Sequence, residues 1–474
     1  MPSTPSQPSV AIAGGGLAGL AAACALADAG FRITLFEKRP FLGGRASSYE
    51  HPGTGEVVDN CQHVLFRVCT NLVKFYERIG VAHQIRWYDE MTFIEPGGRT
   101  SSMKSSALPA PMHTAPSFFG FSFLSATDKL AITRALVPLT LSSPRDDGNS
   151  FLDWLNRHGQ TKNAVARFWQ PILISALSED LDRISVSAAA QVIRESMKSP
   201  AARQMGVPAL PLTDLYNAAG EYVRARGGVL HFRCPVESFS ADATQVRVRA
   251  RGGDQESADR QFDYMVIALP FDALDRVLPD AAESSPIREK ISHFENSPIT
   301  GIHLWFDRQI SDLDHAVLLD RTIQWMFHKS RLQPIRQQSS NGNPAGSYIE
   351  LVVSSSKSLI DKSRAEIVDL ALAEVREFFP AARSATLVKS TVIKEVNATY
   401  SPRPGIDAHR PTPATGWPRV FLAGDWTATG WPATMEGAVR SGYLAAESLA
   451  GAAGKPRRFL VPDLPAAGLM RLFS

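Results

Sequence analysis

The sequence contains little cysteine and almost no excess of charge of either sign. Its four cysteines form no C-x-x-C pair, so neither a disulfide framework nor a zinc site is predicted, and no metal ligands are expected. The chain has fifty lysines and arginines and 47 aspartates and glutamates, which leaves a net charge of +3. This small charge, without a long basic stripe, does not indicate nucleic acid as a partner.

Long apolar runs are also missing. No stretch of about 18 uninterrupted apolar residues occurs, so a transmembrane helix is not expected. The first ten residues, MPSTPSQPSV, lack the basic region of a signal peptide, and we expect residues 1–8 to be a disordered lead to a cytoplasmic protein. The C-terminal tail, residues 453–474, places basic residues beside an apolar stretch. It indicates either contact with the inner face of the cytoplasmic membrane or a plain docking tail.

Several catalytic motifs that a sequence can reveal are absent. There is no G-x-S-x-G nucleophile elbow, no H-E-x-x-H helix and no Walker A lysine loop. A second G-x-G-x-x-G is missing too, because the glycines at 252–253 lie in a polar segment. The chain is therefore expected to bind one dinucleotide and to have no separate nicotinamide domain.

A glycine-rich turn near the N-terminus is the first motif that is present. The pattern G-x-G-x-x-G follows a predicted strand at 9–13 and opens a predicted helix at 17–29, with a second strand at 32–37. Glycines there let backbone N–H groups approach a pyrophosphate, and the carboxylate at the end of the second strand can accept hydrogen bonds from ribose hydroxyls. A solvated surface charge is the alternative role of that carboxylate. The predicted contacts are Gly14, Gly16, Ala18, Gly19, Glu37 and Lys38.

Two further segments extend the predicted nucleotide site. Gly43-Gly44-Arg45 permits a tight loop, in which Gly44 and Arg45 are predicted phosphate contacts; an ordinary loop with a surface arginine is the alternative. Gly424 and Asp425 follow a strand at 419–423 and precede a small-residue helix at 434–450. We expect Asp425 to bind sugar or ribityl hydroxyls. The positive end of that helix, whose small face Gly437, Ala438, Ser441 and Gly442 would provide, should lie beside a flat, anionic flavin.

Residues 59–63, Asp-Asn-Cys-Gln-His, concentrate polar and titratable groups. His63 and Asp59 are the predicted catalytic residues, as a proton donor or an orienting group at the boundary between flavin and substrate. The alternative is a hydrogen-bonded turn with a satisfied histidine.

These elements predict an α/β fold. A Rossmann-type FAD-binding domain would be assembled from the discontinuous segments 9–104, 205–298 and 395–452. The insertions 105–204 and 299–394 would form an α+β substrate domain. Aromatic and apolar stretches at 117–141 and 299–327 are either core or a substrate channel.

Taken together, the motifs resemble the superfamily of flavin-dependent amine oxidases and carotenoid desaturases. Within it the chain resembles the squalene-associated FAD-dependent desaturases, the hydroxysqualene dehydroxylase family. The likeness is carried by DNCQH at 59–63, FWQPILISALSED at 168–180, QWMFHK at 324–329 and LAGDWTATGWPATMEGAVRSG at 422–442. Cys61 departs from the pattern, because many relatives have glycine there. The resemblance also implies FAD contacts by Val236 and Met435.

The resemblance implies a reaction as well. A hydroxysqualene dehydroxylase uses reduced FAD to replace the hydroxyl of hydroxysqualene and gives squalene, in bacterial hopanoid synthesis. An apolar isoprenoid substrate, peripheral membrane contact and a reductant that the sequence does not identify would follow. The alternatives are a carotenoid or polyprenoid desaturase that uses oxidised FAD, and a non-catalytic flavin-binding component of a terpenoid assembly. An amine oxidase comes third, because no amine-binding aromatic pair is recognised.

Overall fold

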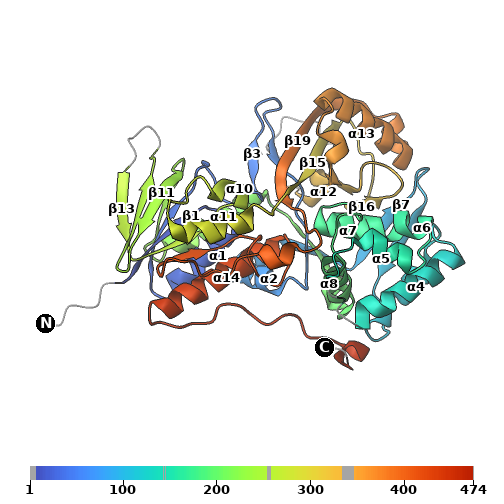
Figure 1. Ribbon diagram of the computed structural model, residues 1–474. Helices are drawn as coiled ribbons and strands as arrows, with labels where there is room; N and C mark the ends of the chain where they lie inside the picture. Colours follow the sequence, from blue (N-terminus) through green and yellow to red (C-terminus); the bar gives the residue numbers. More distant parts are fainter. Residues whose placement is uncertain (1–6, 142–143, 145, 253–257, 334–345, 473–474) are drawn as a thin grey trace.

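The computed structural model describes residues 7–141, 144, 146–252, 258–333 and 346–472. Figure 1 shows the Rossmann-type part on the left, around β1 and α14, and the second part on the right. Of the predicted disordered lead, residues 1–6 lie outside the described residues. Within the described chain, no helix is both long and apolar enough to cross a bilayer.

A five-stranded parallel sheet forms the centre of the first part, as the sequence predicts. Its strands are hydrogen-bonded in the order β10-β2-β1-β14-β20. Because both faces are covered, the strands consist largely of apolar residues. In sheet order the strands are β10 (Val229–His231), β2 (Arg32–Phe36), β1 (Ser9–Ala13), β14 (Tyr264–Ile267) and β20 (Val420–Leu422). The Rossmann-type assembly from discontinuous segments is confirmed.

Two layers cover this sheet. One face packs against helices α1 (Leu17–Asp28), α2 (Thr70–Arg78), α9 (Leu212–Arg224) and α14 (Met435–Ala452). The opposite face packs against an antiparallel sheet of β11 (Val236–Ala241), β12 (Val246–Ala250) and β13 (Ala258–Phe262). A Cβ on Gly442 of α14 would lie 2.2 Å from the carbonyl oxygen of Ala18 in α1. Gly442 therefore lets two helices pack closely, and the prediction that it faces the flavin is wrong.

The second part contains a seven-stranded sheet in the order β19-β15-β18-β17-β16-β7-β8. Its strands are β19 (Leu387–Tyr400), β15 (Asn296–Phe306), β18 (Ser347–Ser354), β17 (Trp325–Phe327), β16 (His315–Leu318), β7 (Glu90–Ile94) and β8 (Thr100–Lys104). One face packs against α13 (Arg364–Phe378). The other packs against a helical layer: α3 (Ala115–Gly120), α4 (Ala126–Leu141), α5 (Phe151–Arg157), α6 (Lys162–Ala164), α7 (Gln170–Leu177) and α8 (Val186–Met197).

Three predicted domain boundaries differ from the strands of the structure. Strand β7 pairs with β16 of the seven-stranded sheet and β8 pairs with β7, so residues 90–104 belong with the insertions and not with the FAD-binding segment. Strands β15 and β19 pair with each other over 296–306 and 387–400, so the boundaries at 298/299 and 394/395 each cut through a strand. Composition does not reveal either point, because the pairing partners are distant in the sequence.

Smaller elements join the two parts. Strands β3 (Ser48–Glu50) and β4 (Val57–Asp59) form a hairpin, and β5 (Leu65–Phe66), β9 (Met205–Pro208) and β6 (Ile85–Tyr88) form a three-stranded sheet. Short helices outside these layers include α10 (Phe271–Leu274), α11 (Ser285–Ile291), α12 (Lys329–Leu332) and the 3₁₀ turn η9 (Ile406–His409).

Candidate active site

One large cavity, about 1050 Å³ in volume, connects the two parts. Its first end lies at the carboxyl ends of β1 and β2, where open parallel sheets bind ligands. Its second end lies among the helices α3, α4, α7 and α8. The predicted site residues line this cavity, with the exceptions of Gly19 and Asp59.

The glycine-rich turn has the close approaches that its sequence predicts. Gly14 has a φ of +107°, and a Cβ there would lie 2.6 Å from the Ala268 carbonyl oxygen. A Cβ on Gly19 would lie 2.0 Å from the Gly14 carbonyl oxygen. Gly19 is not among the residues that line the cavity, and its lack of a side chain allows helix and turn to pack. Gly16 is open on the cavity side, since its nearest neighbour would be the Gly44 Cα at 3.8 Å.

Glu37 is buried at the end of β2 and lines the cavity. Its two carboxylate oxygens accept hydrogen bonds from the backbone N–H groups of Gly15 and Arg39, at 2.7 and 2.8 Å. Each oxygen keeps a second lone pair for a ribose hydroxyl. The adjacent Lys38 is exposed at the cavity.

The Gly43-Gly44-Arg45 loop lies directly against the glycine-rich turn. The Gly43 N–H donates to the Gly15 carbonyl at 2.9 Å. A Cβ on Gly44, whose φ is +60°, would lie 2.9 Å from the Gly16 Cα. Arg45 Nη2 forms an ion pair with Asp425 Oδ1 at 2.5 Å. The two predicted cofactor contacts are thus joined to each other across the cavity.

The Gly424–Asp425 turn and the start of α14 form the remaining wall. Thr434 caps α14 by accepting a hydrogen bond from the Gly437 N–H at 3.1 Å, and Met435 opens the helix beside the cavity. Ser441 accepts from the Gly424 N–H at 2.8 Å, so its role is to hold the turn. Val236 lines the cavity where β11 begins.

These residues fit FAD. Gly14 and Gly44, where a Cβ would clash, line the cavity; a buried carboxylate has spare acceptor capacity; and the capped N-terminus of an 18-residue helix borders the cavity. Such a helix end favours negative charge, as a pyrophosphate or a reduced flavin carries.

His63 lines the cavity and is partly buried. Its Nδ1 lies 2.8 Å from the Cys61 carbonyl oxygen. Because a carbonyl only accepts, Nδ1 carries the proton and Nε2 is left for substrate or water. Burial is the main cause that lowers the pKa of His63, so the neutral form is favoured and this side chain must be protonated before it can act as an acid.

Asp59, the other predicted catalytic residue, does not line the cavity. It is buried, and its Oδ2 accepts from Lys329 Nζ at 2.5 Å while Oδ1 accepts from Ser48 Oγ at 2.5 Å. A carboxylate in this position cannot reach a substrate in the cavity. Of the two roles predicted for Asp59, the geometry does not fit the proton donor and is compatible with the orienting group.

Lys329 is the functional candidate that sequence reasoning missed. Its ammonium group is fully buried and contacts Asp59, the Gln62 amide oxygen at 2.7 Å and the Glu350 carboxylate at 3.3 Å. Gln62 lines the cavity. One cation between two buried carboxylates thus fixes the 59–63 loop to β18. The one feature of the sequence that could have indicated this residue is its position at the end of the apolar segment QWMFHK.

Cys61 is buried within the same loop. Desolvation is the main cause that raises the pKa of its thiol well above the usual value, so the thiol stays protonated and the departure from glycine adds no reactive group.

The far end of the cavity is apolar. The sequence left open whether the stretches 117–141 and 299–327 form core or a substrate channel, and residues of each stretch do both. Those that line the cavity are Phe118, Phe119, Leu136, Val137, Trp325 and Phe327. Ile132 and Leu319 are instead core residues.

Comparisons with known proteins agree with this site. The family of flavin containing amine oxidoreductases matches residues 17–450. The chain is 28% identical over 465 residues to the 15-cis-phytoene desaturase of Synechococcus elongatus, covering 93% of this chain and 95% of that protein. It is also 28% identical over 474 residues to a probable zeta-carotene desaturase of Synechococcus elongatus, covering 93% and 98%.

Among solved structures, an oxidoreductase from Methanosarcina mazei has the same fold, with a TM-score of 0.71 at 16% identity over 92% of this chain and 98% of that one. A match over most of the length, together with a cavity that fits FAD, settles the family. The chain belongs to the flavin containing amine oxidoreductases and is an FAD-dependent oxidoreductase.

Proposed function

We propose that this oxidoreductase transfers hydride between FAD and a long, acyclic isoprenoid. The observation that carries the proposal is the shape of the cavity, which runs without interruption from the flavin residues to an apolar end among four helices. Most of the cavity surface is apolar, and a highly polar substrate would lose more hydration there than the few polar lining groups could replace.

FAD, when bound, supplies hydride transfer and acts as an electron carrier. The protein side chains hold the isoprenoid in place and exclude water from the reacting carbons. His63 Nε2 is the site at which a proton is taken up or released, and Lys329 holds the loop that carries His63.

Desaturation of a carotenoid or polyprenoid is the first candidate. It is supported by relatives that are named phytoene and zeta-carotene desaturases and align over nearly the whole chain. A desaturase removes hydride and a proton from adjacent carbons, and a neutral histidine, as the lowered pKa of His63 favours, suits the role of proton acceptor.

Reductive dehydroxylation of hydroxysqualene is the second candidate. It is supported by the resemblance of residues 422–442 and 324–329 to the hydroxysqualene dehydroxylases. This direction needs a proton for the departing hydroxyl, and His63 would have to supply it from its protonated form.

A paired anaerobic assay distinguishes the two. Oxidised enzyme is mixed with phytoene, and separately reduced enzyme is mixed with hydroxysqualene, while flavin absorbance is followed and products are extracted. Flavin bleaching with a new polyene establishes the desaturase; flavin reoxidation with squalene establishes the dehydroxylase. If neither reaction changes the flavin, the proposed function is wrong and the non-catalytic alternative takes its place.

We also propose that the cavity mouth contacts a membrane. Exposed apolar side chains gather where α3 and α4 line the cavity, including Met112, Phe119 and Val137. The C-terminal tail docks at the same place, because the Leu469 N–H donates to the Ala110 carbonyl at 2.8 Å. The end of the tail thus docks beside this mouth, and an apolar substrate would enter the cavity directly from lipid.

A matched pair of substitutions tests this contact. Val137→Glu should reduce co-sedimentation with phospholipid vesicles severalfold. Val388→Glu, at a valine on strand β19 that is even more exposed than Val137, should leave co-sedimentation unchanged. Equal binding by both variants would exclude the mouth as the membrane contact.

A further inference from the structure

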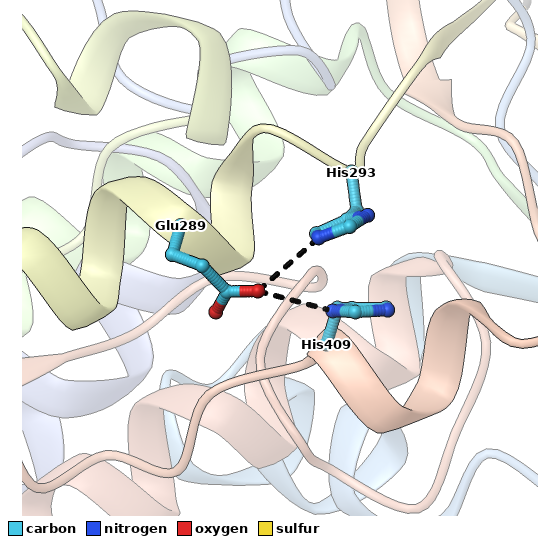
Figure 2. Close-up of side chains that lie close together, drawn as sticks. All are labelled: Glu289, His293 and His409. Carbon is cyan, nitrogen blue, oxygen red and sulfur yellow. Dashed lines mark hydrogen bonds and ion pairs between the residues drawn. The ribbon is translucent and has the colours of Figure 1, made fainter.

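A second cluster of chemically active side chains lies away from the cavity. Glu289 in α11 and His293, just beyond its end, face His409 at the end of η9 (Figure 2). Glu289 Oε1 lies 3.2 Å from His293 Nε2 and 3.9 Å from His409 Nδ1. The two imidazole rings are stacked, with centroids 3.6 Å apart. All three potential ligand atoms lie within 4.8 Å of one another.

We propose that this cluster binds a divalent transition-metal ion, with Zn²⁺ as the best match. Two imidazoles and one carboxylate are the donor set that zinc accepts, at about 2.0–2.2 Å from the ion, and a water can complete a tetrahedron on the exposed side. Mg²⁺ and Ca²⁺ prefer sets made only of oxygen. Donor atoms of a tetrahedral site with bonds of about 2.0–2.2 Å lie about 3.3–3.5 Å apart, so Glu289 and His293 are already near that spacing and His409 must move closer.

The surrounding charges leave the Glu289 carboxylate available. Neighbouring arginines are engaged with other acids: Arg288 pairs with Asp275, and Arg403 pairs with Glu295. Among the described residues, the ion-pair partners of Glu289 are the two histidines alone. The backbone is also fixed, because Arg403 Nη2 donates to the His293 carbonyl at 2.9 Å.

The position of the cluster gives the ion a role. His409 is followed by Arg410, whose buried guanidinium donates to the carbonyls of Asp425, Thr427 and Trp431 at 3.1, 3.0 and 2.7 Å. These residues form the turn that borders the flavin site. An ion that joins α11 to η9 would therefore restrain Arg410 and, through its hydrogen bonds, the turn at 425–431 (the flavin turn).

Calorimetric titration of tag-free, FAD-loaded protein with ZnCl₂ tests the site. One equivalent should bind, MgCl₂ should give no saturable heat, and His409→Gln and Glu289→Gln should each bind at least about tenfold more weakly. His83→Gln, at an exposed histidine outside the cluster, is the control and should bind as the unmodified protein does. Absence of saturable binding, or unchanged affinity in His409→Gln, would overturn the site.

The coupling to the flavin turn has its own readout. On heating, release of FAD is followed by its fluorescence, with and without Zn²⁺. Zinc should raise the release temperature of the unmodified protein and not that of His409→Gln. If zinc binds at the cluster but leaves the release temperature unchanged, the coupling through Arg410 is wrong. Neither measurement depends on the identity of the isoprenoid.

Discussion

The two ends of the cavity are built in different ways. At the flavin end, short motifs place glycines and acids within a few residues of one another, and the sheet brings these motifs together. At the apolar end, helices α3, α4, α7 and α8 each contribute several side chains from one helix face, and these residues form no short sequence motif. The first end is constrained by backbone geometry and the second by volume and polarity, so they should respond differently to substitution.

The largest effect should come from the backbone constraint. Gly19→Ala places a Cβ 2.0 Å from the Gly14 carbonyl oxygen, which no side-chain movement can relieve. Purified protein should contain almost no FAD, measured as the ratio of absorbance at 450 to 280 nm. Gly451→Ala, in α14 with no neighbour within 4 Å, is the control and should retain full flavin content.

The next largest effect concerns the buried charge cluster of Lys329, Asp59 and Glu350, which holds the 59–63 loop to β18. Lys329→Met leaves Asp59 and Glu350 buried without their cation, and unfolding free energy should fall by about 3–5 kcal/mol. Urea unfolding measures this loss. Adding Glu350→Gln should restore part of it.

The exposed pair Lys74–Glu77 provides the comparison. Lys74→Met should cost no more than about 1 kcal/mol. A similar cost for Lys329→Met would mean that the buried cluster does not hold the 59–63 loop.

Substitution of His63 should distinguish an effect on catalysis from an effect on cofactor binding. His63→Ala should lower turnover by roughly 100-fold, while flavin content stays unchanged, because His63 contacts the Cys61 carbonyl and the cavity and not the glycine-rich turn. Full activity in this variant would remove His63 from the mechanism. His83→Ala is the control, which shows whether loss of a histidine side chain lowers turnover merely by reducing stability.

A smaller effect concerns acid stability of the second part. Burial is the main cause that lowers the pKa of His315 to about 4, below the value near 6.5 of an unfolded chain. The unfolded state then binds the proton more readily, so stability is fully present above pH 6.5 and is lost as the pH falls toward 4. The loss from this residue should be about 1–3 kcal/mol at pH 4.

Thermal unfolding between pH 7.5 and 4.5 checks the direction. The unfolding temperature should fall less steeply with decreasing pH in His315→Phe than in the unmodified protein. A variant that is as acid-sensitive as the unmodified protein would show that other groups, such as His113 and His328, whose pKa values burial also lowers to about 4, account for the loss.

The same comparison explains what the sequence could predict. The parallel sheet and its helices were predictable, and most of the residues predicted to contact FAD line the cavity, because glycine spacing, strand-like runs and a capped helix are local signals. The close packing of Gly442 and the burial of Asp59 were not predictable, because each depends on a partner distant in the chain, namely α1 and Lys329. The pairing of β7 with β16 was hidden for the same reason.

The most direct test of the account compares single-turnover flavin kinetics in the unmodified protein and in Ile172→Asp. Ile172 lines the apolar end from α7, and a carboxylate there should weaken isoprenoid binding by roughly 10- to 100-fold without loss of FAD. The account predicts that flavin absorbance changes in proportion to product in the unmodified protein, and that the variant needs correspondingly more isoprenoid to reach the same rate. An unchanged isoprenoid dependence in Ile172→Asp would contradict the claim that the substrate reaches the flavin through this cavity.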